Sequence, residues 1–395
     1  MKKIKVIHIE HCSHSYFLSD EKGNPDEIVK GSWGTQVATE IKKFHPEVDV
    51  ECWFPEKIEK KEKFFEHGKV KLRIFPTTFS PRYALDFSLP MLKALKEESE
   101  KCKKEKIHLI IHIHEYHSLH GLAIAYLFRK EKMVAQHHGG SWPLKHLKKT
   151  KKFRFFFPFF IFGQFLESLA LKNIKQFYAL SQEEIDYLKK TAPNSNIKFQ
   201  TMGIEDEYFK NISKKEARKK LKIPLDKKII IFIGRINEVK GIKYLIDAME
   251  NLKDVELKII GYLQKVEEFK KYAESKNLKN VEFLGGIFGE KKMLYLSAAD
   301  ALVLPSMKEG APVTVMEALA RNTPVVVTNV GGIPLMIEDK REGIIIRQKS
   351  SEDIVNAVRE ILKWKKKNVK EYAEKYRWKR IIEGTYGDYL ELINK

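Results

Sequence analysis

The chain has 395 residues, 43% of them hydrophobic, and a formal net charge of +20. This length is too great for one compact domain and suits two domains of roughly 200 residues each. Its three cysteines (Cys12, Cys52 and Cys102) are odd in number and widely spaced, which argues against a disulfide framework or a cysteine metal cluster. Residues 1–10 alternate like a strand, so no signal peptide is expected and a reducing cytoplasm is the expected location.

Short apolar segments alternate with helical periodicity through the first half of the chain. The expected strands are Lys5–Ile9, Val48–Trp53, Ile107–Ile113, Met133–Gln136 and Gln176–Leu180. Leu89–Cys102 and Leu119–Phe128 carry the helical pattern between them. Alternating strands and helices predict a parallel sheet with helices on both faces, and ligands of such sheets bind at the carboxyl ends of the strands.

The second half restarts the same pattern. The expected strands are Lys228–Ile233, Val255–Ile260, Val281–Leu284, Ala301–Leu304 and Val325–Thr328. A charged linker with a short helix is expected at 205–225, and the helical segment Tyr372–Ile393 is expected to cross back onto the first domain. The pattern predicts an α/β protein of two doubly wound Rossmann-like domains facing across a cleft, with residues 1–205 plus 376–395 in one domain and 206–375 in the other.

Cations follow the first strand of the second half. The segment IGRINEVKGI places Arg235 and Lys240 at a strand–glycine–helix junction, where the carboxyl edge of the sheet would hold a diphosphate. Arginine offers a planar fork and lysine a point charge for phosphate oxygens. Taken alone, both side chains could equally well solvate a loop.

The most informative segment is KEGAPVTVMEALARNTPVV, residues 308–326. It places Glu309 on a loop and Glu317 on the following helix, with a Gly-Ala-Pro turn between them. The free amides and the positive dipole end of a helix N-terminus form a ready phosphate site. Two carboxylates around an anion cradle suit a ligand with hydroxyls at both ends and phosphate in the middle, which is the shape of a nucleotide sugar.

These motifs together resemble the nucleotide-sugar domain of retaining GT-B glycosyltransferases, family 4 (glycosyl transferases group 1). The matching motifs span about 130 residues. They are Gly234-Arg235, Lys240-Gly241, Phe283-Leu284-Gly285, Leu304-Pro305-Ser306, Glu309–Pro312 and Glu317-Ala318. Two departures are Asn322, where glycine is usual before Thr-Pro, and Tyr262-Leu263, where Gly-Asp-Gly is common.

The resemblance implies a role for each matched residue of the second half. Arg235 and Lys240 would hold the donor diphosphate and stabilise it as a leaving group. Glu309 would contact donor-sugar hydroxyls and Glu317 the ribose hydroxyls. The donor would also meet backbone groups, which are those of Gly310, Ala311, Val313 and, at the base, Ile287.

In the first half the resemblance is looser. The family's paired glycines after the first strand correspond to Lys30-Gly31-Ser32-Trp33-Gly34, so Gly31 and Gly34 would let the backbone approach the diphosphate. The family's His-Gly after a strand points to His138 as a catalytic residue facing donor sugar and acceptor, with His137 as the alternative. Either histidine could instead serve only to satisfy buried backbone groups.

A basic and aromatic segment, Lys145–Leu171, is open to two interpretations. Residues 145–154 hold six Lys or Arg and no acid, and seven phenylalanines follow between 153 and 162. The segment could meet an anionic membrane surface, or it could be an aromatic core helix beside a solvated loop. It is too short to span a bilayer. Nothing resembles a nucleic-acid-binding module, so no nucleic-acid partner is expected.

The expected function is therefore that of a retaining hexosyltransferase. It would move a sugar from a UDP- or GDP-sugar to a glycan or lipid-linked acceptor by front-face attack, with Glu309, His138, Arg235 and Lys240 as the catalytic residues. Neither a cofactor nor a metal is expected, because the cations and the helix N-terminus can carry the diphosphate charge. The alternatives are a nucleotide-sugar epimerase, a phosphorylase-like enzyme, or an inactive basic protein that binds membrane or RNA.

Overall fold

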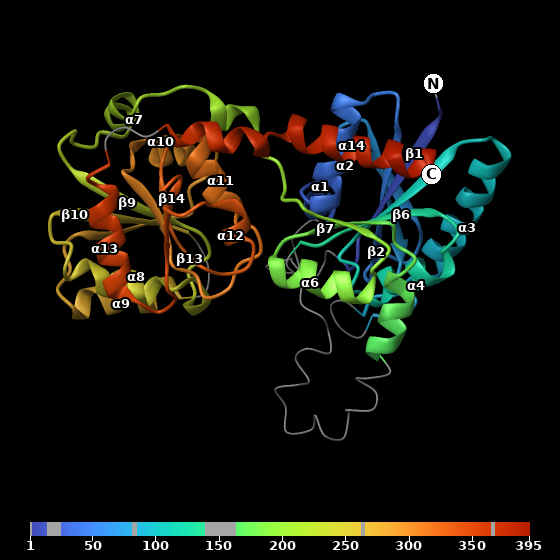
Figure 1. The fold of residues 1–395 in the computed structure, drawn as a ribbon, viewed down its shortest axis with the longest axis horizontal. Helices are drawn as coiled ribbons and strands as arrows, with labels where there is room; N and C mark the ends of the chain where they lie inside the picture. The colour runs from blue at the N-terminus through green and yellow to red at the C-terminus, as the bar shows by residue number, and fades with distance from the viewer. Residues whose placement is uncertain (1, 14–24, 81–84, 139–162, 262–264, 365–367) are drawn as a thin grey trace, which may run out of the picture. The chain divides into compact units, whose positions relative to one another are not determined.

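A computed structural model describes residues 2–13, 25–80, 85–138, 163–261, 265–364 and 368–395 (Figure 1). These residues form two compact units, Met1–Met202 with Ile381–Lys395 (unit 1) and Gly203–Arg380 (unit 2). Each unit is built on one largely or wholly parallel sheet. The expectation of a two-domain α/β fold is confirmed.

Unit 1 contains an eight-stranded sheet in the order β3-β4-β2-β1-β5-β6-β7-β8, with helices packed against it (Figure 1). In chain order its elements are β1 (Ile4–Ile9), α1 (Pro25–Lys30), α2 (Trp33–Phe44), β2 (Asp49–Glu56), β3 (Lys63–His67), β4 (Val70–Pro76), α3 (Leu89–Lys104), β5 (His108–His114), α4 (Leu119–Leu127), β6 (Lys132–Gln136), a helix at 163–171, β7 (Gln176–Ala179), α6 (Gln182–Thr191) and β8 (Asn196–Phe199).

The central strands of unit 1 are buried and largely apolar, with histidines and a lysine among their buried residues. All six residues of β1 are buried, and β5 is buried from Leu109 onward. Strands β3, β4 and β8 were not predicted. β3 and β8 are short strands at the two edges of the sheet, and along β8 exposed polar residues alternate with partly buried apolar ones. β3 pairs antiparallel with β4 and is the exception to the parallel order.

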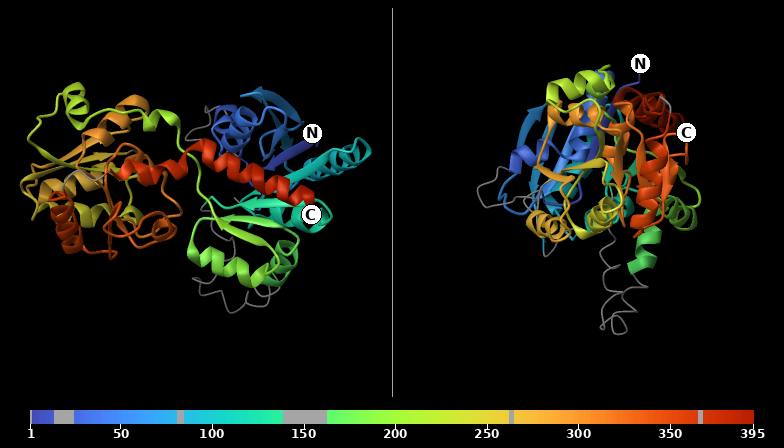
Figure 2. Two further views of the ribbon diagram at one scale, coloured as in Figure 1. Left: turned by 45° about the horizontal axis from the view of Figure 1, so that its top comes forward. Right: turned by 90° about the vertical axis from the view of Figure 1, so that its left-hand side faces the viewer.

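The chain ends in a helix that completes unit 1. This helix, α14 (Trp378–Asn394), contributes its residues from Ile381 onward to unit 1. Lys2 Nζ donates to Asn394 Oδ1 at 2.5 Å, and the rings of His45 and Tyr386 stack with centroids 3.7 Å apart. In both views of Figure 2 the two termini accordingly lie close together.

Unit 2 contains a fully parallel six-stranded sheet in the order β11-β10-β9-β12-β13-β14. Its elements are η3 (Asp206–Phe209), α7 (Lys214–Leu221), β9 (Lys228–Ile233), η4 (Glu238–Lys240), α8 (Ile242–Met249), β10 (Val255–Ile260), α9 (Val266–Ser275), β11 (Val281–Gly285), α10 (Gly289–Ala298), β12 (Ala301–Leu304), α11 (Val313–Ala320), β13 (Val325–Thr328), α12 (Ile333–Met336), β14 (Gly343–Ile346), α13 (Ser351–Ile361) and η5 (Val369–Tyr376). A helix connects each strand to the next strand along the chain, as the alternating pattern predicts.

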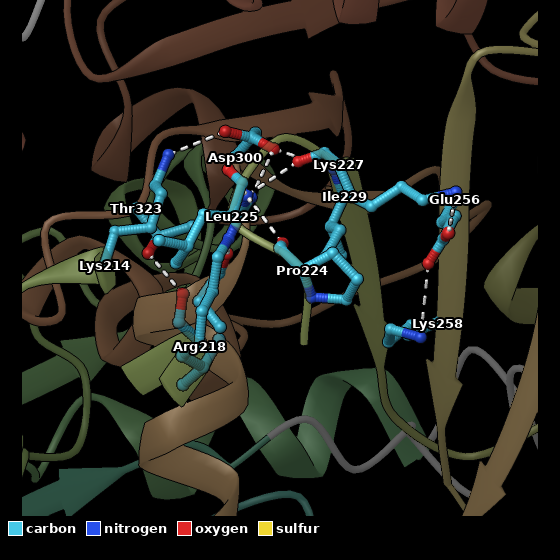
Figure 3. A network of polar contacts seen from close by, with 12 residues as sticks. Lys214, Arg218, Pro224, Leu225, Lys227, Ile229, Glu256, Lys258, Asp300 and Thr323 are labelled. Carbon is cyan, nitrogen blue, oxygen red and sulfur yellow. Dashed lines mark hydrogen bonds and ion pairs between the residues drawn. The ribbon is translucent and has the colours of Figure 1, made fainter. Parts of the chain in front are cut away.

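A buried arginine fastens α7 to the amino-terminal edge of this sheet (Figure 3). Arg218 is 3% exposed and donates to the carbonyl groups of Leu225 and Lys227 at 2.7 Å each. Its guanidinium also pairs with Asp300 at 3.0 Å, and Asp300 accepts from the amide of Ile229 at 2.7 Å. The network connects the segment before β9 to the start of β12. It lies at the amino-terminal edge of the sheet, away from the carboxyl ends of the strands.

Candidate functional site

The predicted donor site of unit 2 forms where β9, β12 and β13 end. The loop after β12 carries Glu309, and the loop after β9 carries Lys240, the last residue of η4. Lys240 Nζ lies 2.6 Å from Glu309 Oε1, and Ser306 Oγ donates to the same oxygen at 2.6 Å. The Lys240 and Glu309 side chains are only 16% and 7% exposed. The structure thus brings together two predicted site residues that stand 69 positions apart.

Two glycines allow these loops to approach so closely. Gly241 has φ of 69°, and a Cβ on it would lie 2.0 Å from the carbonyl oxygen of Pro305. Gly331 has φ of 58°, and a Cβ there would lie 2.1 Å from the carbonyl oxygen of Glu309. Only glycine combines positive φ with this lack of space. The Lys240 and Glu309 loops are therefore held against their neighbours by backbone contact.

Helix α11 begins immediately after this loop. Pro312 is its N-cap residue and supplies no side-chain hydrogen bond, so the first amides of the helix have no side-chain cap. The loop residues Gly310 and Ala311 and the first helical residue Val313 are all partly exposed. The amides before and within the first turn can therefore receive an anion, as the sequence predicts.

Glu317 lies one turn into α11 and is held by a lysine that the sequence analysis did not identify. Lys292 of α10 places Nζ 2.7 Å from Oε1 and 2.6 Å from Oε2 of Glu317, whose side chain is 7% exposed. Burial and the nearby Glu317 charge raise the pKa of Tyr208, so its hydroxyl stays protonated. Lys292 stands 25 positions before Glu317 and belongs to none of the matched motifs, so no local signal marks it.

Two other predicted residues, Arg235 and Ile287, also lie at this edge of the sheet. Arg235 follows β9 and is exposed, and among the described residues none forms a hydrogen bond or ion pair with it. Ile287 follows β11, an edge strand, and is partly exposed. Arg235 is therefore the cation of the set that remains available to a diphosphate.

In unit 1 the predicted residues gather at the carboxyl ends of β1, β5 and β6. Gly34 belongs to α2 and is buried, and its amide donates to Glu10 Oε1 at 2.8 Å. A Cβ on Gly34 would lie 2.5 Å from that oxygen and 3.1 Å from the His114 ring. Gly34 thus packs against a carboxylate and a histidine, whereas Gly31 lies exposed in the turn before α2.

The two candidate histidines after β6 have different partners. His137 Nδ1 lies 2.8 Å from Glu184 and Nε2 lies 3.5 Å from Glu115, so carboxylates occupy both ring nitrogens. His138 Nε2 lies 2.7 Å from His114 Nδ1, whereas His138 Nδ1 has no hydrogen-bond partner among the described residues. His138 is thus a partly exposed residue with one buried ring nitrogen whose hydrogen bond the described residues do not supply.

The pKa of His138 is held well below its usual value, first by burial and then by repulsion from His114. His138 is consequently neutral at physiological pH and can act as a hydrogen-bond donor or acceptor. Its backbone amide donates to Glu115 Oε1 at 2.6 Å, and Glu115 has φ of 62°. A non-glycine residue in this left-handed conformation at a candidate site is strain held by its surroundings.

Comparison with known proteins identifies the unit that carries the two glutamates. Residues 213–377 match the profile of the family described as glycosyl transferases group 1. This part of the chain is therefore similar to a group 1 glycosyltransferase domain. An uncharacterized glycosyltransferase of Methanocaldococcus jannaschii is 30% identical over 212 residues, which is 50% of this chain and 54% of that protein.

Other relatives show similar coverage. A D-inositol 3-phosphate glycosyltransferase of Corynebacterium aurimucosum is 27% identical over 196 residues, or 45% of this chain and 47% of the relative. The chain thus spans about half the length of these curated relatives. Over the matched residues the chain is therefore similar to proteins named as glycosyltransferases.

Solved structures match the whole fold. Sucrose-phosphate synthase from Thermosynechococcus elongatus has a TM-score of 0.70 at 19% identity, covering 99% of this chain and 100% of that one. Anabaena HepE in complex with UDP-glucose has a TM-score of 0.61 at 14% identity, covering 98% and 100%. At such identities the likeness shows the fold alone, and the chain accordingly has the GT-B fold that the sequence predicts.

Proposed function

We propose that this protein transfers a hexosyl group from a nucleoside diphosphate sugar, a UDP- or GDP-sugar, to a glycan or lipid-linked acceptor. The observation that carries the proposal is the Lys240–Glu309 pair beside the start of α11, with Glu317 on the same helix. This arrangement supports a site for a sugar, a diphosphate and a ribose in that order. The UDP-glucose named in the HepE complex has these three parts.

In this proposal the chain's own charges stabilise the leaving group. Arg235, Lys240 and the amides at the start of α11 would contact the diphosphate as negative charge develops on it. Loss of one such contact typically costs about 3 kcal/mol of transition-state stabilisation. Because these groups can supply the positive charge, we propose that the reaction proceeds without a metal ion. Activity that persists in EDTA supports this, and activity restored only by added Mg²⁺ or Mn²⁺ refutes it.

We further propose retention of configuration by front-face attack. Glu309 is held by Lys240 and Ser306 and is assigned to the sugar hydroxyls, so the acceptor proton would pass to the leaving phosphate oxygen. His138 of unit 1 is assigned to a hydrogen bond with the transferred sugar or the acceptor. The anomeric configuration of the product tests retention, and a trapped glycosyl-enzyme adduct would overturn the front-face route.

The decisive experiment is a thermal-stability screen of UDP-, GDP- and ADP-sugars. We expect one nucleotide series to raise the melting temperature of the wild type, since a ligand that binds only the folded state stabilises it. Glu317→Ala removes the proposed ribose contact and should abolish the shift. If no nucleotide sugar stabilises the wild type, the proposed function is wrong.

We also propose that the protein meets an anionic membrane surface through Lys145–Leu171. Most of this segment lies outside the described residues. Its end, the helix at 163–171, exposes apolar side chains, namely Phe165 (58%), Leu166 (47%) and Leu169 (36%). Among the described residues, no helix combines the length and apolarity that crossing a membrane requires.

Vesicle sedimentation tests this contact. The protein should sediment with vesicles containing anionic lipid and much less with neutral vesicles, because basic residues are drawn to anionic headgroups. Phe165→Ser with Leu169→Ser should weaken sedimentation, whereas Phe64→Ser, at another exposed phenylalanine (68%), should not. Equal sedimentation with neutral and anionic vesicles contradicts the proposal.

A further inference from the structure

Three histidines of unit 1 form a continuous row that ends at His138. His8 Nδ1 lies 2.9 Å from His114 Nε2, and His114 Nδ1 lies 2.7 Å from His138 Nε2. Both distances are those of hydrogen bonds between ring nitrogens. His8 and His114 are fully buried, whereas His138 is partly exposed at the end of the row.

The sheet itself produces this row. β1 and β5 are adjacent parallel strands in which His8 is the register partner of His112, and His114 follows two residues later on the same face. His138 stands two residues beyond the last residue of β6, the next strand. The row therefore runs from the interior of the sheet toward its carboxyl edge.

Because the histidine rings of the row are neutral, all hydrogen bonds along the row must point the same way. Burial lowers the pKa of His114 to about 4 and holds the pKa of His8 well below its usual value, with mutual repulsion adding to the effect for His8. A neutral imidazole has one N–H donor and one bare acceptor nitrogen. Each ring must therefore donate on one side and accept on the other, so all the hydrogen bonds point either outward or inward.

The two ends of the row select the direction. His8 Nε2 and His138 Nδ1 are both buried, and neither has a hydrogen-bond partner among the described residues. One end must carry an unpaired N–H and the other a bare nitrogen. An unpaired N–H in a fully buried place is rarer than an unpaired acceptor. An oxygen of a ligand can reach the partly exposed His138 at the sheet edge and satisfy an N–H there, whereas nothing can reach His8 in the core, so the proton is better placed on His138.

We propose that His114 is a positioning residue, which accepts from His8, donates to His138 and so fixes His138 as a hydrogen-bond donor through Nδ1–H. This rests on the proposed function, in which His138 meets a sugar or acceptor oxygen. Aligned hydrogen bonds polarise one another, which strengthens the terminal donor. The Trp33 ring packs edge-on against His138 at 4.7 Å and limits its rotation.

A metal ion is the competing explanation for this cluster. His8, His112 and His114 can place ligand nitrogens within 4.8 Å of one another, and His112 Nε2 lacks a partner among the described residues. However, both nitrogens of His114 already form hydrogen bonds, and a metal would have to break one of them. We therefore favour the hydrogen-bonded row and make a bound metal an outcome of the test.

Two matched substitutions separate the two sides of His114. The amide of asparagine reproduces the Nδ1 side of histidine, whereas the amide of glutamine reproduces the Nε2 side. His114→Asn should keep the bond to His138 and retain kcat within about threefold. His114→Gln should lose that bond and lower kcat by about tenfold or more. The KM for the donor should stay similar. A tenfold change corresponds to the free energy that one well-oriented hydrogen bond contributes. Equal loss in both variants would show that His114 has only a packing role.

A measurement without substrate separates this inference from the proposed function. Nitrogen-15 NMR of histidine-labelled protein reports which ring nitrogen of His138 is protonated, with the signal assigned by its loss in His138→Asn. We expect Nδ1–H in the wild type and His114→Asn, and a change of tautomer in His114→Gln. Nε2–H in the wild type, or stoichiometric metal in the purified protein, overturns the proposal. Failure of nucleotide sugars to bind would refute the proposed function and leave the NMR result standing.

Discussion

Replacing Glu309 by glutamine is the sharpest test of the donor site, because it removes one charge and keeps the side chain's shape. Glu309 accepts from Lys240 and from Ser306, both at 2.6 Å, and is 7% exposed. A hydrogen bond to a charged group contributes about 1.5–3 kcal/mol, and a neutral amide retains part of this. We expect Glu309→Gln to destabilise the free protein by about 1–2 kcal/mol.

The assay is thermal denaturation of the wild type and the variant, alone and with ligand. For a unit the size of Gly203–Arg380, about 1–2 kcal/mol corresponds to a loss of about 2–8 °C in melting temperature. The nucleoside diphosphate should stabilise the variant at least as much as the wild type, because Lys240 no longer has a competing carboxylate. The additional stabilisation from the sugar should vanish, because the hydroxyls lose a charged acceptor.

The matched control is Glu317→Gln, which alters the other carboxylate of the same helix. Lys292 binds that carboxylate at 2.6–2.7 Å, so a similar loss of stability is expected. The effect of Glu317→Gln on ligand binding should differ from that of Glu309→Gln, because both the nucleoside diphosphate and the nucleotide sugar contain the ribose. Glu317→Gln should weaken both ligands equally. If Glu309→Gln also weakens both equally, Glu309 is not at the sugar end and the assignment fails.

Three further outcomes are expected. Gly34→Ala should destabilise unit 1 by about 1–3 kcal/mol in chemical denaturation, since the added Cβ would lie 2.5 Å from a Glu10 oxygen. The control is Gly387→Ala in helix α14, where the added Cβ meets open space, and it should stabilise the protein by about 0.5–1 kcal/mol. Gly241→Ala should abolish nucleotide-dependent stabilisation in the thermal screen, because positive φ and the Pro305 carbonyl exclude a Cβ next to Lys240. Acidification from pH 7 to 5 should lower the melting temperature of unit 1 and spare unit 2, because all 13 histidines lie within residues 1–202.

The sign of the acid effect follows from the buried histidines. Burial lowers the pKa of His114 and His120 to about 4, whereas the unfolded chain binds the same protons near pH 6.5. Between these values the unfolded state holds more protons, so stability falls as the pH falls. From pH 7 to 5 the loss is about 2 kcal/mol for each such histidine. Equal acid sensitivity of the two units in domain-resolved hydrogen exchange would contradict this.

The sequence predicted most of the fold because the central strands are continuous apolar segments. Lys228–Ile233 and Val255–Ile260 were predicted with the bounds that the structure shows. The edge strand Asn196–Phe199 was missed, since its alternating exposed polar residues resemble a loop. The departure at Asn322 is also explained, because its φ of 60° is a conformation that asparagine tolerates better than most residues and glycine adopts freely.

The candidate site was predictable only where it is local in sequence. Glu309 and Glu317 share one short segment whose turn and helix are visible in the pattern. Lys292 reaches Glu317 from another helix, and His114 reaches His138 from another strand, so only the folded chain reveals these pairs. The alternating histidines of β5 were nevertheless a usable signal, because residues two apart on a strand share a face.

In the free site each carboxylate is already paired with a lysine, so a bound donor must replace the pairing that its diphosphate disrupts. Lys240 neutralises Glu309 and Lys292 neutralises Glu317, which leaves Arg235 as the exposed cation of the predicted set. A diphosphate that draws Lys240 away leaves the Glu309 carboxylate buried without its cation, which is costly. Sugar hydroxyls that donate to Glu309 offset that cost, whereas a bare nucleoside diphosphate cannot. The wild type should therefore favour the nucleotide sugar over the diphosphate by about tenfold or more, and Glu309→Gln should erase that preference.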